Sequence, residues 1–170
     1  MKIMTKKEIN IFTENIYPDW ELDEFEIIKN TREIVEFYLE QLTDVSCLEG
    51  FDFNTLTFDI LFCDSKKTHQ INRDYREKDY PADIITFAIF ADDDAKFILD
   101  DDINLGEIII ALDKVKEEAI KQEVSDTYEL YFLIAHGILH LLGFDHQTEE
   151  DYNFVVEVQK KALKSAQISQ

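Results

Sequence analysis

Two nearly continuous apolar runs constrain the fold of this chain more than any other feature. The runs are DIITFAIF, residues 83–90, and LGEIIIAL, residues 105–112, and both are rich in β-branched and aromatic residues. Runs of this kind are typical of central strands that are covered on both faces. Because helices must supply that cover, the two runs predict a layered protein in which helices pack on a sheet.

Further elements follow from periodicity. TLTFDILFC, residues 55–63, alternates apolar and polar residues and predicts a third strand, and KIMTKKEINIF, residues 2–12, predicts a short one. Helices are predicted over 24–42, from the capping residues Asp64 and Ser65 to Arg76, from Asp126 to Gly143, and after Thr148. The expected fold class is α/β (α+β), with a single-layer mixed sheet of about four strands and about four to five helices.

On the helix predicted over 24–42, the apolar residues that fall at helical spacing are Phe25, Ile28, Val35, Tyr38, Leu39 and Leu42. We expect the helix to pack on the sheet with these residues.

Length and composition predict one domain over residues 1–170, because 170 residues with 45% hydrophobic content bury one good core. The sequence shows neither the apolar stretch of a secretory signal nor a run approaching a membrane span. We therefore expect a soluble, cytoplasmic protein with no membrane partner.

Charge argues against nucleic-acid binding over most of the chain. The formal net charge is -20 at pH 7, whereas a phosphate backbone is bound largely by Lys and Arg. One window is different. Residues 66–78 contain two acidic residues and five basic ones, which are Lys66, Lys67, Arg73, Arg76 and Lys78.

The segment HGILHLLGFDH, residues 136–146, holds three of the four histidines. His136 and His140 lie one helical turn apart, and Gly143 allows the chain to turn and bring His146 back as a third ligand. Three imidazoles would leave a tetrahedral zinc ion one open position for water. Two alternatives remain: three unrelated histidines, or a closed structural zinc with a fourth ligand such as Asp145 or a cysteine.

The spacing also matches the zinc-protease pattern H-E-x-x-H-x-x-G-x-x-H, except at its catalytic glutamate. Gly137 stands at that position and has no side chain to act as a general base. This difference disfavours peptide hydrolysis by the protease mechanism.

HGILHLLGFDH resembles the H-G-x-L-H-L-x-G-[YF]-D-H signature of the YbeY family, bacterial endoribonucleases of ribosomal RNA maturation. INRDYREKDYPADIITF, residues 71–87, and LGEIIIA, residues 105–111, are similar to two further blocks of that family. The sequence departs from the family at Ala82, where Thr is common, and at Thr86, where Ser is common.

The resemblance implies a zinc-dependent, single-strand-specific endoribonuclease that acts in 16S rRNA 3′ end maturation and ribosome quality control. His136, His140 and His146 would hold one zinc ion and, with Arg76, form the catalytic set, because a guanidinium matches phosphate geometry. The other basic residues of the window, Lys66, Lys67, Arg73 and Lys78, are expected to bind RNA.

Other residues are assigned by their setting. Asp145 is expected to orient a ligand histidine or to cap the turn. Glu107, in an otherwise apolar strand, is expected either to meet a fixed partner near the metal or to face water at the strand end. Gly137 is expected to leave space beside the metal for a phosphate and ribose.

Three questions stay open at the level of sequence. The general base is the metal hydroxide, the RNA 2′-hydroxyl acting through it, or a carboxylate such as Asp145. The function is the ribonuclease, another zinc hydrolase such as a protease or amidase, or a non-catalytic zinc-stabilised module that binds ribosomes. Because of the net charge, a ribosomal protein or other partner is expected to deliver single-stranded RNA.

Overall fold

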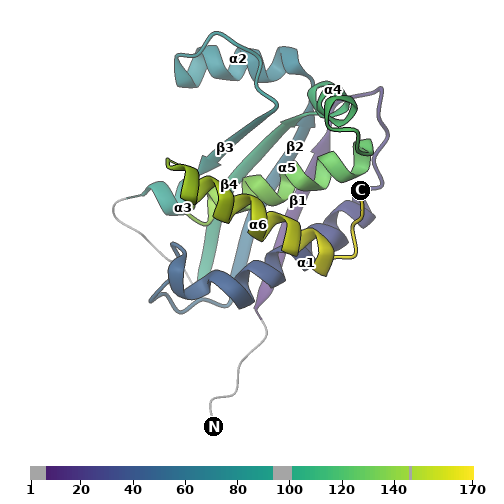
Figure 1. The fold of residues 1–170 in the computed structure, drawn as a ribbon. Coiled ribbons are helices and arrows are strands. Elements are labelled where there is room, and N and C mark those ends of the chain that lie inside the picture. Colours follow the sequence, from purple (N-terminus) through teal and green to yellow (C-terminus); the bar gives the residue numbers. More distant parts are fainter. Residues whose placement is uncertain (1–6, 94–100, 146) are drawn as a thin grey trace.

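The computed structural model describes residues 7–93, 101–145 and 147–170. In these ranges, four strands alternate with helices as far as β4, and three helices follow it, which gives six α-helices (Figure 1). Their bounds, in chain order with the short 3-10 helix η1, are β1 (Glu8–Asn15), α1 (Glu24–Leu42), η1 (Thr43–Val45), β2 (Thr55–Cys63), α2 (Ser65–Arg76), β3 (Ile84–Ala88), α3 (Ile89–Asp92), β4 (Asp102–Ala111), α4 (Leu112–Gln122), α5 (Asp126–Leu141) and α6 (Glu149–Ser165). The predicted class, helices on a four-stranded mixed sheet, is confirmed.

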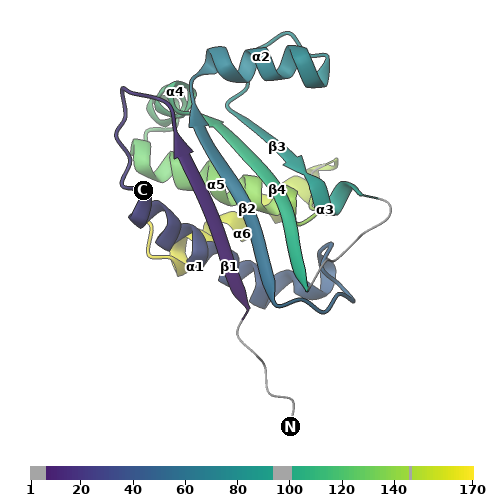
Figure 2. The same cartoon turned by 180° about the vertical axis from the view of Figure 1, so that it is seen from behind.

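The sheet has the strand order β1-β2-β4-β3. Strands β1, β2 and β4 are parallel, and β3 runs antiparallel to β4 at the edge. Helices α1, α5 and α6 lie across one face of the sheet (Figure 1), whereas, of the described helices, only α2 lies on the opposite face, near one end (Figure 2). The sheet therefore has one fully covered face and one largely open face.

This arrangement corrects the expectation that both apolar runs form central strands. The run 105–112 supplies the central strand β4, but the run 83–90 supplies the edge strand β3, which ends at Ala88. Gly106 lies opposite Ala88 with φ +129, and a Cβ there would come within 1.9 Å of the Phe87 carbonyl oxygen. The close approach of the two backbones at this point requires glycine.

The core has two parts. The larger lies between the covered face and the helices and includes Tyr38, Phe58 and Ile108. The smaller lies under α2, where Ile71 packs with Cys63, Ala82, Ile85 and Ile109. Burial of Ile71 thus holds α2 against the end of the open face.

Three further sequence expectations are corrected. Phe25 was expected on the apolar side of the first helix, yet it is 81% exposed, and α1 buries Ile27 and Ile34 instead. Helix α5 begins at Asp126 as predicted, after the N-cap Ser125, but it ends at Leu141 and not at Gly143. Helix α4 was not predicted at all.

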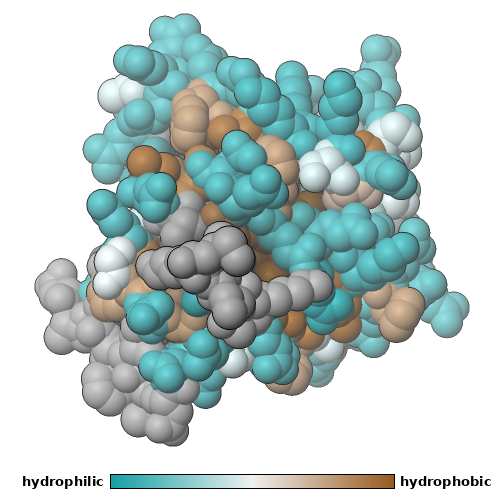
Figure 3. Space-filling model, turned by 90° about the horizontal axis from the view of Figure 1, so that it is seen from below, coloured by the Kyte–Doolittle hydropathy of each residue, from teal (hydrophilic) through white to brown (hydrophobic). Residues whose placement is uncertain are grey.

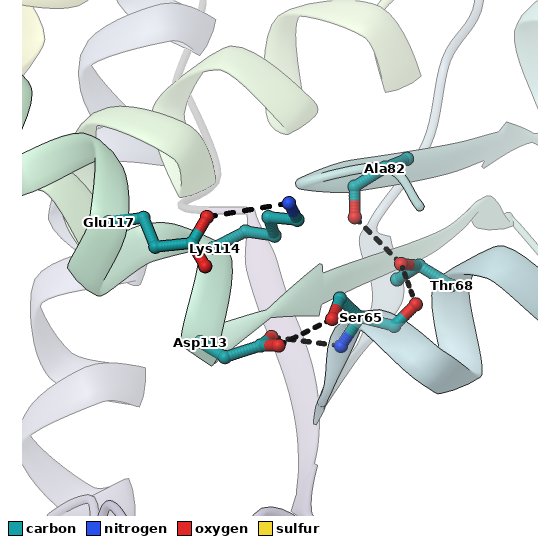
Figure 4. Close-up of polar contacts among 6 residues, drawn as sticks. All are labelled: Ser65, Thr68, Ala82, Asp113, Lys114 and Glu117. Carbon is teal, nitrogen blue, oxygen red and sulfur yellow. Dashed lines mark hydrogen bonds and ion pairs between the residues drawn. The ribbon is translucent and has the colours of Figure 1, made fainter. Parts of the chain in front are cut away.

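Polar contacts fix the N-terminal half of α2 (Figure 4). The Ser65 backbone amide and hydroxyl both donate to the carboxylate of Asp113 on α4. The Thr68 hydroxyl donates to the Ala82 carbonyl oxygen at 2.7 Å, just before β3. An ion pair between Lys114 and Glu117, 3.4 Å long, lies beside them on α4. These contacts give α2 a defined position, and its last residue is Arg76.

The surface agrees with the high charge content. Hydrophilic residues cover most of the face in Figure 3, and hydrophobic ones show between them. Within the described ranges, no helix is both long enough and apolar enough to span a membrane.

Candidate active site

His136 and His140 lie in the last half of α5, one turn apart. Their Nε2 atoms are 2.9 Å apart and their ring centroids 4.6 Å apart. Two imidazoles bound to one tetrahedral zinc, at about 2.0–2.1 Å each, would place these nitrogens about 3.3 Å apart. A small rotation of the rings therefore seats one ion between them, and the pair fits a metal site.

The third predicted ligand, His146, lies outside the described residues. Over the residues that are described, no three metal-ligating side chains converge. Of the three predicted ligands, the structure therefore gives the geometry of two, His136 and His140.

Gln159 on α6 orients His136, a role that sequence reasoning missed. Its side-chain amide donates to the Phe132 carbonyl oxygen at 3.2 Å, which turns Oε1 toward His136 Nδ1 at 3.4 Å. Gln159 is 1% exposed, so this orientation is set by the packing of α6 on α5. Nδ1 donates to Oε1, and the ring then presents the lone pair of Nε2 to the metal position.

Replacing Gln159 with alanine is expected to weaken zinc binding about 10-fold to 100-fold, the usual cost of losing a partner of a ligand histidine. Zinc affinity is measured by competition with a chromophoric chelator. Gln70→Ala on the exposed side of α2 is the matched control, and it should bind zinc as the wild type does. Unchanged affinity in Gln159→Ala would contradict the assigned role.

A cavity of about 370 Å³ opens beside the two histidines. We call it the histidine cavity, and the polar side chains that line it are Arg76, Thr86, Asp92, His136, His140 and Asp145. It joins the C-terminal end of α2, the edge strand β3 and the C-terminal half of α5. A cationic group, a histidine pair and two carboxylates therefore face one space.

Arg76 is held in this cavity by Asn72, one turn earlier on α2. The Arg76 guanidinium donates to Asn72 Oδ1 at 3.3 Å, and Asn72 Nδ2 donates to the Tyr80 carbonyl oxygen at 2.8 Å. Asn72 is completely buried, so it links the arginine to the turn that follows the helix. The remaining guanidinium donors stay available for an anion.

The structure does not bring the rest of the basic window to the histidines. Lys66 and Lys67 lie exposed at the start of α2, about 15 Å along the helix from Arg76. Arg73 and Lys78 are exposed as well, and neither lines the histidine cavity. Their contact with RNA stays a prediction, and these side chains lie on the outer surface of α2 and the turn after it.

The two predicted acidic residues are placed differently. Asp145 lines the histidine cavity and accepts a hydrogen bond from Gln147 at 3.1 Å. Glu107 lies on β4 next to Ile108, which packs toward α5, so alternation puts Glu107 on the open face. There, burial and the neighbouring Asp59 raise the pKa of Glu107. The expectation that Glu107 supports the metal site is not met.

Gly137 does not leave space for a phosphate, contrary to the sequence expectation. It is buried on the side of α5 that packs on the sheet and does not line the histidine cavity. A Cβ at this position would lie 3.0 Å from two side-chain carbons of Ile108 and 3.1 Å from Ile84. Glycine is needed here so that α5 can pack closely against β4 and β3.

Gly137→Ala is therefore expected to destabilise the protein by about 1–2 kcal/mol, because overpacking outweighs the better helix propensity of alanine. The penalty should shrink in an Ile108→Val background, which removes one of the two contacting carbons. Urea denaturation of the four variants in this double-mutant cycle measures both effects. Equal stability of Gly137→Ala and wild type would show that the packing is looser than the structure indicates.

Comparison with known proteins places the chain in a family. Residues 12–167 match the profile of the family described as Endoribonuclease YbeY. The chain is 39% identical over 144 residues to Endoribonuclease YbeY of Bacillus cytotoxicus, covering 83% of this chain and 90% of that protein. It is 36% identical to the Fusobacterium nucleatum protein of the same name, covering 77% and 78%.

A solved structure supports the fold. The solution structure of a Thermotoga maritima protein superposes with a TM-score of 0.58 at 21% identity, covering 93% of this chain and 88% of that one. At this identity the likeness concerns the fold alone. The profile match over residues 12–167 and the curated relatives show that this chain belongs to the YbeY endoribonuclease family.

Proposed function

We propose that this protein is a zinc-dependent endoribonuclease that cleaves single-stranded ribosomal RNA, in the maturation of the 16S rRNA 3′ end and in ribosome quality control in the cytoplasm. The observation that carries the proposal is the shared cavity of His136, His140 and Arg76 in a chain of the YbeY family. The arrangement suits phosphodiester hydrolysis, which needs charge stabilisation around the phosphate and an activated nucleophile.

The residues have separable roles. His136 and His140, with His146 as the proposed third ligand, hold the zinc ion, which supplies a Lewis acid and a water of lowered pKa when bound. Arg76 donates to non-bridging phosphate oxygens, and Asn72 keeps its guanidinium pointed into the cavity. Asp92 and Asp145 are the carboxylates that line the cavity among the described residues, so they are the proton acceptors closest to the reaction.

The test is cleavage of a single-stranded rRNA fragment by the zinc-loaded protein, by protein stripped with a strong chelator, and by stripped protein after zinc is restored. We expect cleavage, loss and recovery in that order. A duplex RNA and a peptide library serve as alternative substrates and should stay intact. Peptide cleavage would favour the other zinc hydrolases, and a zinc-dependent rise in melting temperature without any turnover would favour a binding module.

We also propose that a ribosomal protein or another ribosome-associated partner delivers the RNA. The support is the net charge of -20, against which the basic residues of α2 are a local exception. Unaided binding should be weak and should fall steeply with salt. Tight binding of single-stranded RNA by the isolated protein at physiological salt would remove the need for a partner.

A further inference from the structure

A second cavity, of about 520 Å³, adjoins the histidine cavity. We call it the Glu129 cavity. Ile84 and His136 line both cavities, so the two spaces lie on either side of these residues and a ligand of nucleotide size can reach from one to the other around them. The residues that line the Glu129 cavity come from the start of β3, the end of α4, and helices α5 and α6.

Three aromatic residues, Tyr128, Phe132 and Tyr152, line part of its wall. Tyr128 and Phe132, one turn apart on α5, stack with centroids 6.3 Å apart and an angle of 22° between their planes. Tyr152 of α6 also lines the cavity and is about half exposed. Flat aromatic surfaces next to a site for phosphate favour the binding of a nucleobase by stacking.

Glu129 is the unusual group in this cavity. Its side chain lines the space, yet the residue is only 6% exposed. Among the described residues the structure gives its carboxyl group no hydrogen-bond or ion-pair partner. Burial, with the nearby Glu118 and Asp83, raises the pKa of Glu129 to about 7. Because the carboxyl oxygens open onto the cavity, a ligand there that donates hydrogen bonds to them is stabilised.

The charges of the two cavities orient such a ligand. Three carboxylates, Asp83, Glu118 and Glu129, line the second cavity against one cation, Lys160, so the excess negative charge disfavours phosphate there. Arg76 and the metal position lie in the histidine cavity and attract it. A nucleotide that spans both therefore places its phosphate at Arg76 and its uncharged base beside Glu129.

We propose that the Glu129 cavity binds the base of the nucleotide next to the cleaved phosphodiester and prefers guanine. The inference rests on the proposed function. Guanine is favoured because its Watson–Crick edge presents two adjacent N–H donors, which match the two oxygens of a carboxylate. Donation of two hydrogen bonds also stabilises the ionised form of Glu129, so binding offsets the cost of burying it.

A cationic side chain of a protein partner is the competing occupant, since acidic and aromatic groups also suit arginine. The shared wall at His136 argues against it. A guanidinium in this cavity would approach the metal-binding end of α5, where a second positive charge is unfavourable. An RNA base brings no such charge.

The test compares the zinc-loaded wild type, Glu129→Gln and Glu117→Gln on a pool of single-stranded RNA with random sequence. Glu117 is exposed on α4 and does not line the cavity, so it is the control for the change of charge. Sequencing of the products should show guanine enriched about tenfold next to the cut for the wild type and Glu117→Gln. Glu129→Gln should cut the pool with that enrichment lost.

A binding measurement separates this inference from the proposed function. Guanosine monophosphate should bind the wild type about tenfold more tightly than adenosine or uridine monophosphate, and Glu129→Gln should lose the difference. Cleavage without guanine enrichment overturns the inference and leaves the ribonuclease intact. Guanine-selective binding without any RNA cleavage overturns the proposed ribonuclease function but leaves the guanine-binding role of the Glu129 cavity supported. If Glu129→Gln keeps both preferences but loses binding of an arginine-rich peptide, the cavity is a protein-docking site and the inference fails.

Discussion

Replacement of His140 by alanine is expected to abolish stoichiometric zinc binding and to reduce cleavage of single-stranded RNA by more than about 100-fold. The expected loss exceeds the 10-fold to 100-fold cost of removing a partner behind a ligand, because the ligand itself is lost. His140 Nε2 faces His136 Nε2 at 2.9 Å, and among the described residues that line the cavity these two carry the imidazoles. Elemental analysis of the purified protein measures the metal, and gel-resolved cleavage measures the activity.

His69→Ala provides the matched control. His69 lies on α2, where Nε2 is 2.7 Å from Asp79 Oδ1, and it does not line the histidine cavity. This variant should keep both its zinc and its activity. If His140→Ala cleaved RNA as fast as His69→Ala, the reaction would not depend on the proposed metal site.

The sequence predicted those elements whose apolar pattern is strong. The alternation in residues 55–63 marks β2 with its observed bounds, and α6 follows Thr148 as expected, with Thr148 as its N-cap. Helix α4 was missed because its segment, LDKVKEEAIKQ, buries only Leu112, Val115 and Ala119 and is otherwise mostly charged. Those three residues do follow helical spacing, but Leu112 had been counted as the end of the preceding strand.

Apolar runs were a poorer guide to the position of a strand in the sheet. In β3, Ile85 is buried although the strand lies at an edge, because α2 covers this end of the open face. The open face elsewhere is lined by residues such as Phe12, which is 59% exposed. Which strand is central depends on pairing between distant segments, and the local pattern does not contain that information.

In the candidate site, too, features that depend on local spacing were predicted and features that depend on contacts between distant segments were not. Sequence spacing predicted that His136 and His140 would face one point, and the structure places Arg76 in the same cavity. Gln159 was missed, although a glutamine among Val155, Val158 and Ala162 on a buried helix face is a usable signal. Gly137 was misinterpreted because its close neighbour Ile108 lies on β4, and the local sequence around Gly137 does not reveal that contact.

Arg76→Ala is expected to lower kcat for RNA cleavage by about 10²-fold to 10³-fold while zinc content stays unchanged, the usual effect of removing one donor that stabilises developing charge. Arg76→Lys should recover only part of the rate, since an ammonium group lacks the planar pair of donors. Single-turnover cleavage of a defined single-stranded RNA isolates this step from product release.

Arg73→Ala is the control for the loss of a positive charge from α2. Arg73 is exposed one turn before Arg76 and outside the histidine cavity, so its removal should weaken RNA binding without lowering the single-turnover rate at saturating RNA. Arg76 differs because Asn72 fixes its guanidinium at the cavity. Arg76→Ala and Arg73→Ala could instead lose the same activity, and saturating RNA could restore the rate of both. In that case Arg76 would serve RNA binding alone, and the metal would have to supply the charge stabilisation.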